Sequence, residues 1–225
     1  MSDFLQTIEI ETAPQPEAAV IWLHGLGADG NDFVPIVDEL DLRGMPALRF
    51  VFPNAPMRPV TINGGMGMRA WYDITDLEFA ARQEDEVGIR DSARILSRLI
   101  AREDVRGITE ARIVVAGFSQ GGAIVLHGGL RHPARLAGIL ALSTYLPLAA
   151  TLAAESSAAN RDTPIFMAHG VQDAVIPFAA ADRSRNQLRE AQYRLEWREY
   201  PMDHAVCVEE IRDLNAWLRA CLAAR

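Results

Sequence analysis

Hydrophobic and polar positions alternate along the chain in two repeating patterns. Short, mostly apolar runs predict strands at 18–25, 48–53, 112–118, 136–143, 164–170 and 193–201. Segments with apolar residues on one helical face predict helices at 31–40, 85–104, 178–191 and 206–222. Because strands and helices alternate, we expect an α/β fold with a mostly parallel central sheet and helices on both faces.

Composition limits the class of protein further. The 225 residues are 49% hydrophobic and 23% charged, which predicts a single domain over 1–225. A net charge of −8 disfavours nucleic acid and anionic membranes as partners. The sequence shows neither a signal peptide nor a stretch long and apolar enough for membrane insertion, so we expect a cytoplasmic protein. Cys207 and Cys221, if both lie on the last helix, are about 21 Å apart and cannot form a disulfide.

Reactive side chains of such sheets gather where strands end. Four candidates follow predicted strands directly: His24, Ser119, Asp173 and His204. Ser119 stands in the stretch GFSQGG, between an apolar strand and a helix. Glycines two positions before and after it, Gly117 and Gly121, permit the tight strand-to-helix turn that exposes a nucleophilic serine.

A serine nucleophile needs a base, and the chain has five histidines. Four of them are predicted to have structural roles: His24, His127, His132 and His169. His204 is the candidate base, because it alone lies downstream of both the serine and a strand-end acid. Asp173 is preferred as the orienting acid over Asp203, whose side chain should point away from its neighbour His204. The order Ser119, Asp173, His204 is that of α/β hydrolases.

An oxyanion also needs donors. The backbone N–H of Gln120 opens the helix after the serine, and the glycine-rich loop HGLGADG offers the backbone N–H of Leu26. The same loop also spells GxGxxG, a dinucleotide-binding pattern. No acidic residue ends the next strand, which disfavours that alternative.

Five motifs together resemble the phospholipase/carboxylesterase family of α/β hydrolases, which includes acyl-protein thioesterases and small bacterial carboxylesterases. They are HGLGADGNDF, FPNAPMRPVTINGGMGMRAWYDI, GFSQGGA, LSTYLP and EYPMDHAVCVEE, and the likeness spans Val20 to about Trp217. The resemblance implies a single-domain serine esterase without a lid, the same triad and oxyanion donors, and a weak expectation of a homodimer. One departure is Ala174, where relatives commonly have proline, and it bears on the stiffness of the loop that holds Asp173.

The acyl pocket is less defined. Met66, Met68 and Trp71 lie in a Gly- and Met-rich stretch that either lines an apolar groove or packs over the sheet edge, with Trp71 the preferred groove residue. Val175, beside the predicted acid, either continues this groove or belongs to the core. Residues 145–161, where lipases of this fold often insert a cap, are too few and too poor in large apolar side chains to form one.

The predicted function is a serine esterase that hydrolyses short- to medium-chain carboxylic esters through an acyl-serine intermediate and needs no metal or cofactor. Thioesters of acylated proteins and lysophospholipids remain possible substrates beside small acyl esters. A catalytically silent hydrolase-fold protein that binds small apolar ligands is the alternative.

Overall fold

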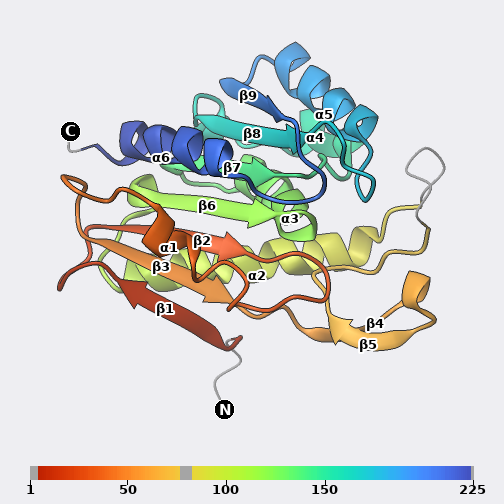
Figure 1. The fold of residues 1–225 in the computed structure, drawn as a ribbon, viewed down its shortest axis with the longest axis horizontal. Coiled ribbons are helices and arrows are strands. Elements are labelled where there is room, and N and C mark those ends of the chain that lie inside the picture. The colour runs from red at the N-terminus through yellow and green to blue at the C-terminus, as the bar shows by residue number, and fades with distance from the viewer. Residues whose placement is uncertain (1–4, 77–82, 224–225) are drawn as a thin grey trace.

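The computed structural model describes residues 5–76 and 83–223, which build a twisted seven-stranded sheet between two helix layers (Figure 1). The strand order is β1-β3-β2-β6-β7-β8-β9, and only β1, at one edge, runs antiparallel to its neighbour. The strands are β1 (Thr7–Glu11), β2 (Ala18–Leu23), β3 (Leu48–Pro53), β6 (Ile113–Phe118), β7 (Gly138–Leu142), β8 (Ile165–Gly170) and β9 (Leu195–Tyr200). A separate hairpin joins β4 (Met57–Val60) to β5 (Met66–Arg69).

Two apolar layers flank the sheet. One face is covered by α2 (Glu86–Val105), α3 (Gln120–Arg131) and α5 (Phe178–Glu190), and the other by α1 (Ile36–Glu39) and α6 (Val208–Leu222). Alternate residues of one strand enter different layers, so that Ile21 of β2 packs on the first and Val20 on the second. Strands buried on both faces explain the continuous apolar runs of the sequence.

The six predicted strands are confirmed, with ends that shift by at most a few residues. The predicted helix over 31–40 is reduced to α1, because Pro35 disfavours helical backbone in the residue before it and the chain forms turns up to that point. The predicted absence of a cap over 145–161 is confirmed. That segment contains only two 3-10 turns and the one-turn helix α4 (Leu152–Glu155).

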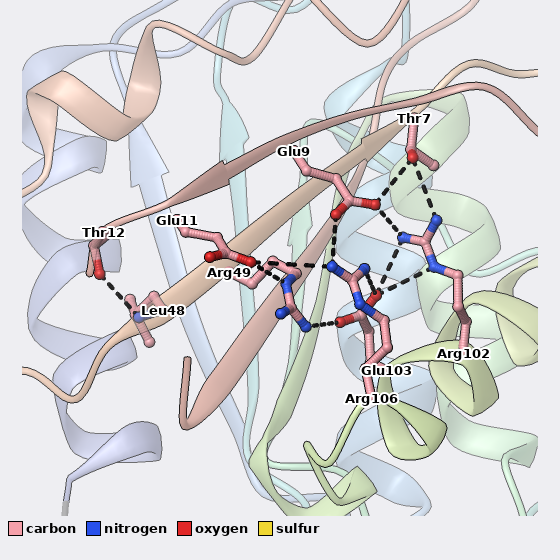
Figure 2. A network of polar contacts seen from close by, with 9 residues as sticks. All are labelled: Thr7, Glu9, Glu11, Thr12, Leu48, Arg49, Arg102, Glu103 and Arg106. Carbon is pink, nitrogen blue, oxygen red and sulfur yellow. Dashed lines mark hydrogen bonds and ion pairs between the residues drawn. The ribbon is translucent and has the colours of Figure 1, made fainter. Parts of the chain in front are cut away.

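The edge strand β1 was not predicted, and a charged cluster ties it to α2 (Figure 2). Glu103 of α2 is fully buried and accepts hydrogen bonds from Arg49 at 2.7 Å and from Arg106 at 2.9 Å. Arg49 and Arg106 in turn contact Glu11 and Glu9 of β1, both at 2.9 Å. The cluster therefore replaces the hydration of a buried carboxylate with guanidinium groups from two elements.

No helix in the described parts of the chain is both long and apolar enough to cross a membrane. Cys207 and Cys221 are both free.

Candidate active site

Ser119 occupies the turn between β6 and α3 with φ 55° and ψ −119°, a strained conformation for a residue with a side chain. The two predicted glycines are required by space. A Cβ on Gly117 would lie 2.4 Å from the carbonyl carbon of Gly121, and a Cβ on Gly121 would lie 2.3 Å from the oxygen of Leu23 in β2. The turn can therefore form only where both positions lack a side chain.

The structure brings the three predicted triad residues into one hydrogen-bonded line. His204, in the loop between β9 and α6, has its Nε2 2.9 Å from Ser119 Oγ and its Nδ1 2.7 Å from Asp173 Oδ2. Because the carboxylate accepts, Nδ1 carries the hydrogen and Nε2 is free to accept the serine proton. Asp203, the alternative acid, lies exposed beside His204.

Asp173 lies in the turn after β8, and its side chain is fully buried. Its Oδ1 accepts hydrogen bonds from the backbone amides of Val175 at 2.9 Å and Ile176 at 2.8 Å. Burial alone would raise the pKa of Asp173, but the hydrogen bonds from His204 and these amides outweigh it and hold the pKa below its usual value. The carboxylate is therefore charged and fixed in direction.

The loop after β2 passes directly beside the serine. A Cβ on Gly25 would lie 3.4 Å from Ser119 Cβ, and Gly27 needs its positive φ of 77°. The amide of Leu26 lies between these two glycines, and the amide of Gln120 is the first of α3, where helix N–H groups have no partner within the helix. The two segments that carry the predicted oxyanion donors therefore both adjoin the serine, and the donor role itself stays a prediction.

The expectation that Trp71 lines an apolar groove does not agree with its position. The side chain is fully buried, its Nε1 donates to the oxygen of His24 at 2.9 Å, and its ring lies 5.4 Å from the His24 ring. An indole N–H is best placed in the core where a carbonyl can accept from it. Trp71 therefore supports the loop after β2 from within the protein and does not contribute to an open surface.

The side chain of Gln120 has a second role that the sequence did not reveal. Its Oε1 accepts from the amide of Trp71 and its Nε2 donates to the oxygen of Tyr72, both at 2.7 Å. The residue that follows the serine therefore ties the segment after β5 to the start of α3. The glutamine in GFSQGG was the available signal, because a buried amide needs partners on both sides.

Met66 and Val175 are 66% and 54% exposed, so both are available to a ligand. Met68, with Met57 and residues 27–32 of the loop after β2, lines an open hollow of about 620 Å³. Met66 and Val175 do not line that hollow. Their role in substrate binding stays a prediction.

The remaining histidines fit structural roles. Burial lowers the pKa of His24 and His132, and lowers that of His127 to about 4, so all three are neutral. His24 accepts from the amide of Ala55 through Nε2, which fixes the orientation of its ring at the start of the loop after β2. Within residues 5–76 and 83–223, no three His, Cys, Asp or Glu side chains are placed to hold a metal ion.

The sequence matches the Phospholipase/Carboxylesterase family over residues 5–222. The chain belongs to this family. Acyl-protein thioesterase 1 of Mycosarcoma maydis is 39% identical over 94% of both chains, and acyl-protein thioesterase 1 of Neurospora crassa is 40% identical over 89% of this chain and 85% of that one. Membership of this family makes the protein a hydrolase of ester or thioester bonds.

A solved structure supports the same conclusion for the fold. The structure of Zea mays acyl-protein thioesterase 2 superposes with a TM-score of 0.86 at 27% identity, covering 98% of this chain and all of that one. The predicted α/β-hydrolase fold is confirmed.

Proposed function

We propose that Ser119, His204 and Asp173 form the catalytic triad of a serine esterase. His204 Nε2 takes the proton of Ser119 Oγ as that oxygen attacks the carbonyl carbon of the substrate. Asp173 holds the hydrogen on Nδ1 and stabilises the imidazolium that forms. The imidazolium then gives its proton to the departing alcohol or thiol, which leaves an acyl-serine.

Water completes the reaction by the same route. His204 removes a proton from water, the resulting hydroxide attacks the acyl carbon, and Ser119 regains its proton as the acid departs. In both steps the carbonyl oxygen becomes an oxyanion. We assign the amides of Leu26 and Gln120 as its donors, because the loop after β2 and the start of α3 both adjoin Ser119. Both donors belong to the backbone, so they need no reorganisation during the reaction.

The observation that carries this proposal is the unbroken line from Ser119 Oγ through His204 to Asp173, with contacts of 2.9 and 2.7 Å. The strained backbone of Ser119 adds to it, because such strain is maintained where a side chain must be presented. A silent ligand-binding protein has no need for either feature, so the esterase is favoured over that alternative.

The substrate class we propose is an acyl ester or thioester, and we place an S-acylated protein first because the similar curated proteins bear the name acyl-protein thioesterase. The open hollow beside the loop after β2 supports a large leaving group. Small acyl esters and lysophospholipids are the other candidates.

We also propose a cytoplasmic location, to which the two free cysteines are suited. We further propose a homodimer, which light scattering after gel filtration would test.

A substrate panel tests the proposed function. Purified protein is incubated with p-nitrophenyl esters of increasing chain length, an S-palmitoylated peptide and a lysophospholipid. We expect hydrolysis of the short esters, and a kcat/KM for the peptide thioester at least about tenfold above that for the lysophospholipid. The reverse preference would move the substrate to lipids, and no hydrolysis of any compound would favour the ligand-binding alternative.

A further inference from the structure

A second histidine adjoins the proposed triad. His169, near the end of β8, is fully buried, and its Nε2 lies 2.9 Å from the oxygen of Ile176 and 3.4 Å from Asp173 Oδ2. A carbonyl oxygen can only accept, so Nε2 must carry the hydrogen. Nδ1 has no hydrogen-bond partner among the described residues, which fits its unprotonated state.

This contact closes the turn that presents the acid. Ile176 is held at both of its backbone groups, because its amide donates to Asp173 Oδ1 and its oxygen accepts from His169. At the start of the turn, the amide of Val171 donates to the oxygen of Tyr200 at 2.9 Å. The turn is therefore pinned to β9 at one end and to the His169 ring at the other.

The hydrogen bond from His169 to Ile176 restrains a turn whose residue types give its backbone little stiffness. Ala174, at the tip of the turn, is exposed and has no ring to restrict its backbone. The side chain of Asp173 can keep its direction only if the backbone on both sides of Ala174 is fixed. On the far side, the hydrogen bond from His169 to Ile176 contributes that restraint.

We propose that His169 is a positioning residue, whose neutral imidazole clamps Ile176 and places its N–H beside Asp173, so that the carboxylate points at His204. The inference rests on the proposed function and goes beyond it, because His169 touches neither the substrate nor the serine. A positioned carboxylate holds the His204 ring in the orientation that accepts the serine proton, and a loosened carboxylate does not.

The charge state of His169 matters for this role. Burial lowers the pKa of His169 by more than the hydrogen bond to Ile176 and the charge of Asp173 raise it, so the ring stays neutral. From α5, the uncharged ring of Phe178 lies against it, with ring centroids 6.2 Å apart. A positively charged His169 would compete with His204 for the carboxylate of Asp173. Because His169 is neutral, Asp173 keeps its hydrogen bond with His204.

Two variants and a control test the proposal in the full-length protein. His169→Leu removes the donor, and His169→Gln keeps an N–H that can reach the Ile176 oxygen. His132→Leu is the control, because it removes a buried imidazole whose nitrogens have no hydrogen-bond partner within the described residues. Turnover of p-nitrophenyl butyrate is measured as a function of substrate concentration and divided by the number of sites that a fluorophosphonate labels.

We expect His169→Leu to lower kcat per labelled site about tenfold with KM within about twofold, because positioning acts on the transition state. His169→Gln should restore most of kcat, because it keeps a donor to Ile176. His132→Leu should leave kcat and KM unchanged. If His169→Leu does not fold, His169→Asn, whose amide is too short to reach Ile176, replaces it with the same expectation.

The proposal is overturned if the donor-free variant keeps the wild-type kcat per labelled site, or if the glutamine variant is as impaired as the leucine variant. A loss confined to the number of labelled sites would also overturn it, because a merely structural role lowers the number of active sites without changing kcat per site. Failure of the proposed function is distinguishable, since it would appear in the wild-type protein as a lack of hydrolysis or labelling.

Discussion

The buried carboxyl of Glu210 should make the free energy of unfolding depend on pH. It is the third residue of α6, fully buried, and neither carboxyl oxygen completes a hydrogen bond within the described residues. Burial raises its pKa to about 8, and the nearby backbone of Cys207 lowers it by less. In the folded protein this carboxyl is therefore protonated at neutral pH, whereas in the unfolded chain it is ionised.

The sign and size of the effect follow from linkage. Between a pKa near 4.5 unfolded and about 8 folded, the folded state binds the extra proton, so stability is full below the lower value and declines until the higher one. At about 1.4 kcal/mol per pH unit, the total loss approaches 5 kcal/mol. Roughly 1 kcal/mol of it is lost by pH 5, and about 3 kcal/mol more between pH 5 and pH 8.

Urea unfolding, followed by tryptophan fluorescence at pH 5, 6, 7 and 8, measures this term in wild type and Glu210→Gln. The glutamine variant cannot titrate, so its advantage over wild type should grow by about 3 kcal/mol from pH 5 to pH 8. A change in packing caused by the substitution contributes equally at every pH, so it cancels when the difference at pH 5 is subtracted from the difference at pH 8. Glu209→Gln, on the exposed side of the same turn, is the control, because it makes the same substitution without removing a buried carboxyl. A flat difference for Glu210→Gln would refute the reasoning.

Three further predictions concern the cluster on β1, the acid and access to the serine. Glu103→Ala should lower the free energy of unfolding by about 3 to 5 kcal/mol, because it leaves Arg49 buried without its main partner; a loss below about 1 kcal/mol in urea titrations would contradict this. Asp173→Asn should reduce kcat toward p-nitrophenyl butyrate far more than Asp203→Asn, since only Asp173 contacts His204, and the reverse ranking would transfer the role. Because 145–161 forms no cap, the rate should show no jump as an ester passes its solubility limit, and a steep rise there would indicate a lid.

The sequence predicted the sheet and the site most successfully where one physical constraint decided the outcome. Strands buried on both faces must be apolar throughout, so β2, β3, β6, β7 and β8 were visible as runs. The crowding around Ser119 admits only glycine two positions away on each side, so the turn was visible as a motif. The positions of Asp173 and His204 followed from the rule that parallel strands end at one edge.

What the sequence did not reveal depends on partners far along the chain. The edge strand β1 alternates polar and apolar residues over only five positions, and its attachment relies on arginines of β3 and α2. The local sequence around Trp71 is the same whether its side chain lines a groove or donates a hydrogen bond to the oxygen of His24, so the sequence could not distinguish the two positions. The contact between His169 and Ile176 depends on the shape of a turn, which residue types alone do not fix.

The central claim is that Ser119 is the nucleophile. The most direct measurement compares fluorophosphonate labelling and p-nitrophenyl butyrate hydrolysis in wild type, Ser119→Ala and the control Ser97→Ala on α2. Ser119→Ala should fold as wild type does, take up no label and lose at least about a thousandfold in turnover, while the control matches wild type. Label or near-normal hydrolysis that survives in folded Ser119→Ala would contradict the account.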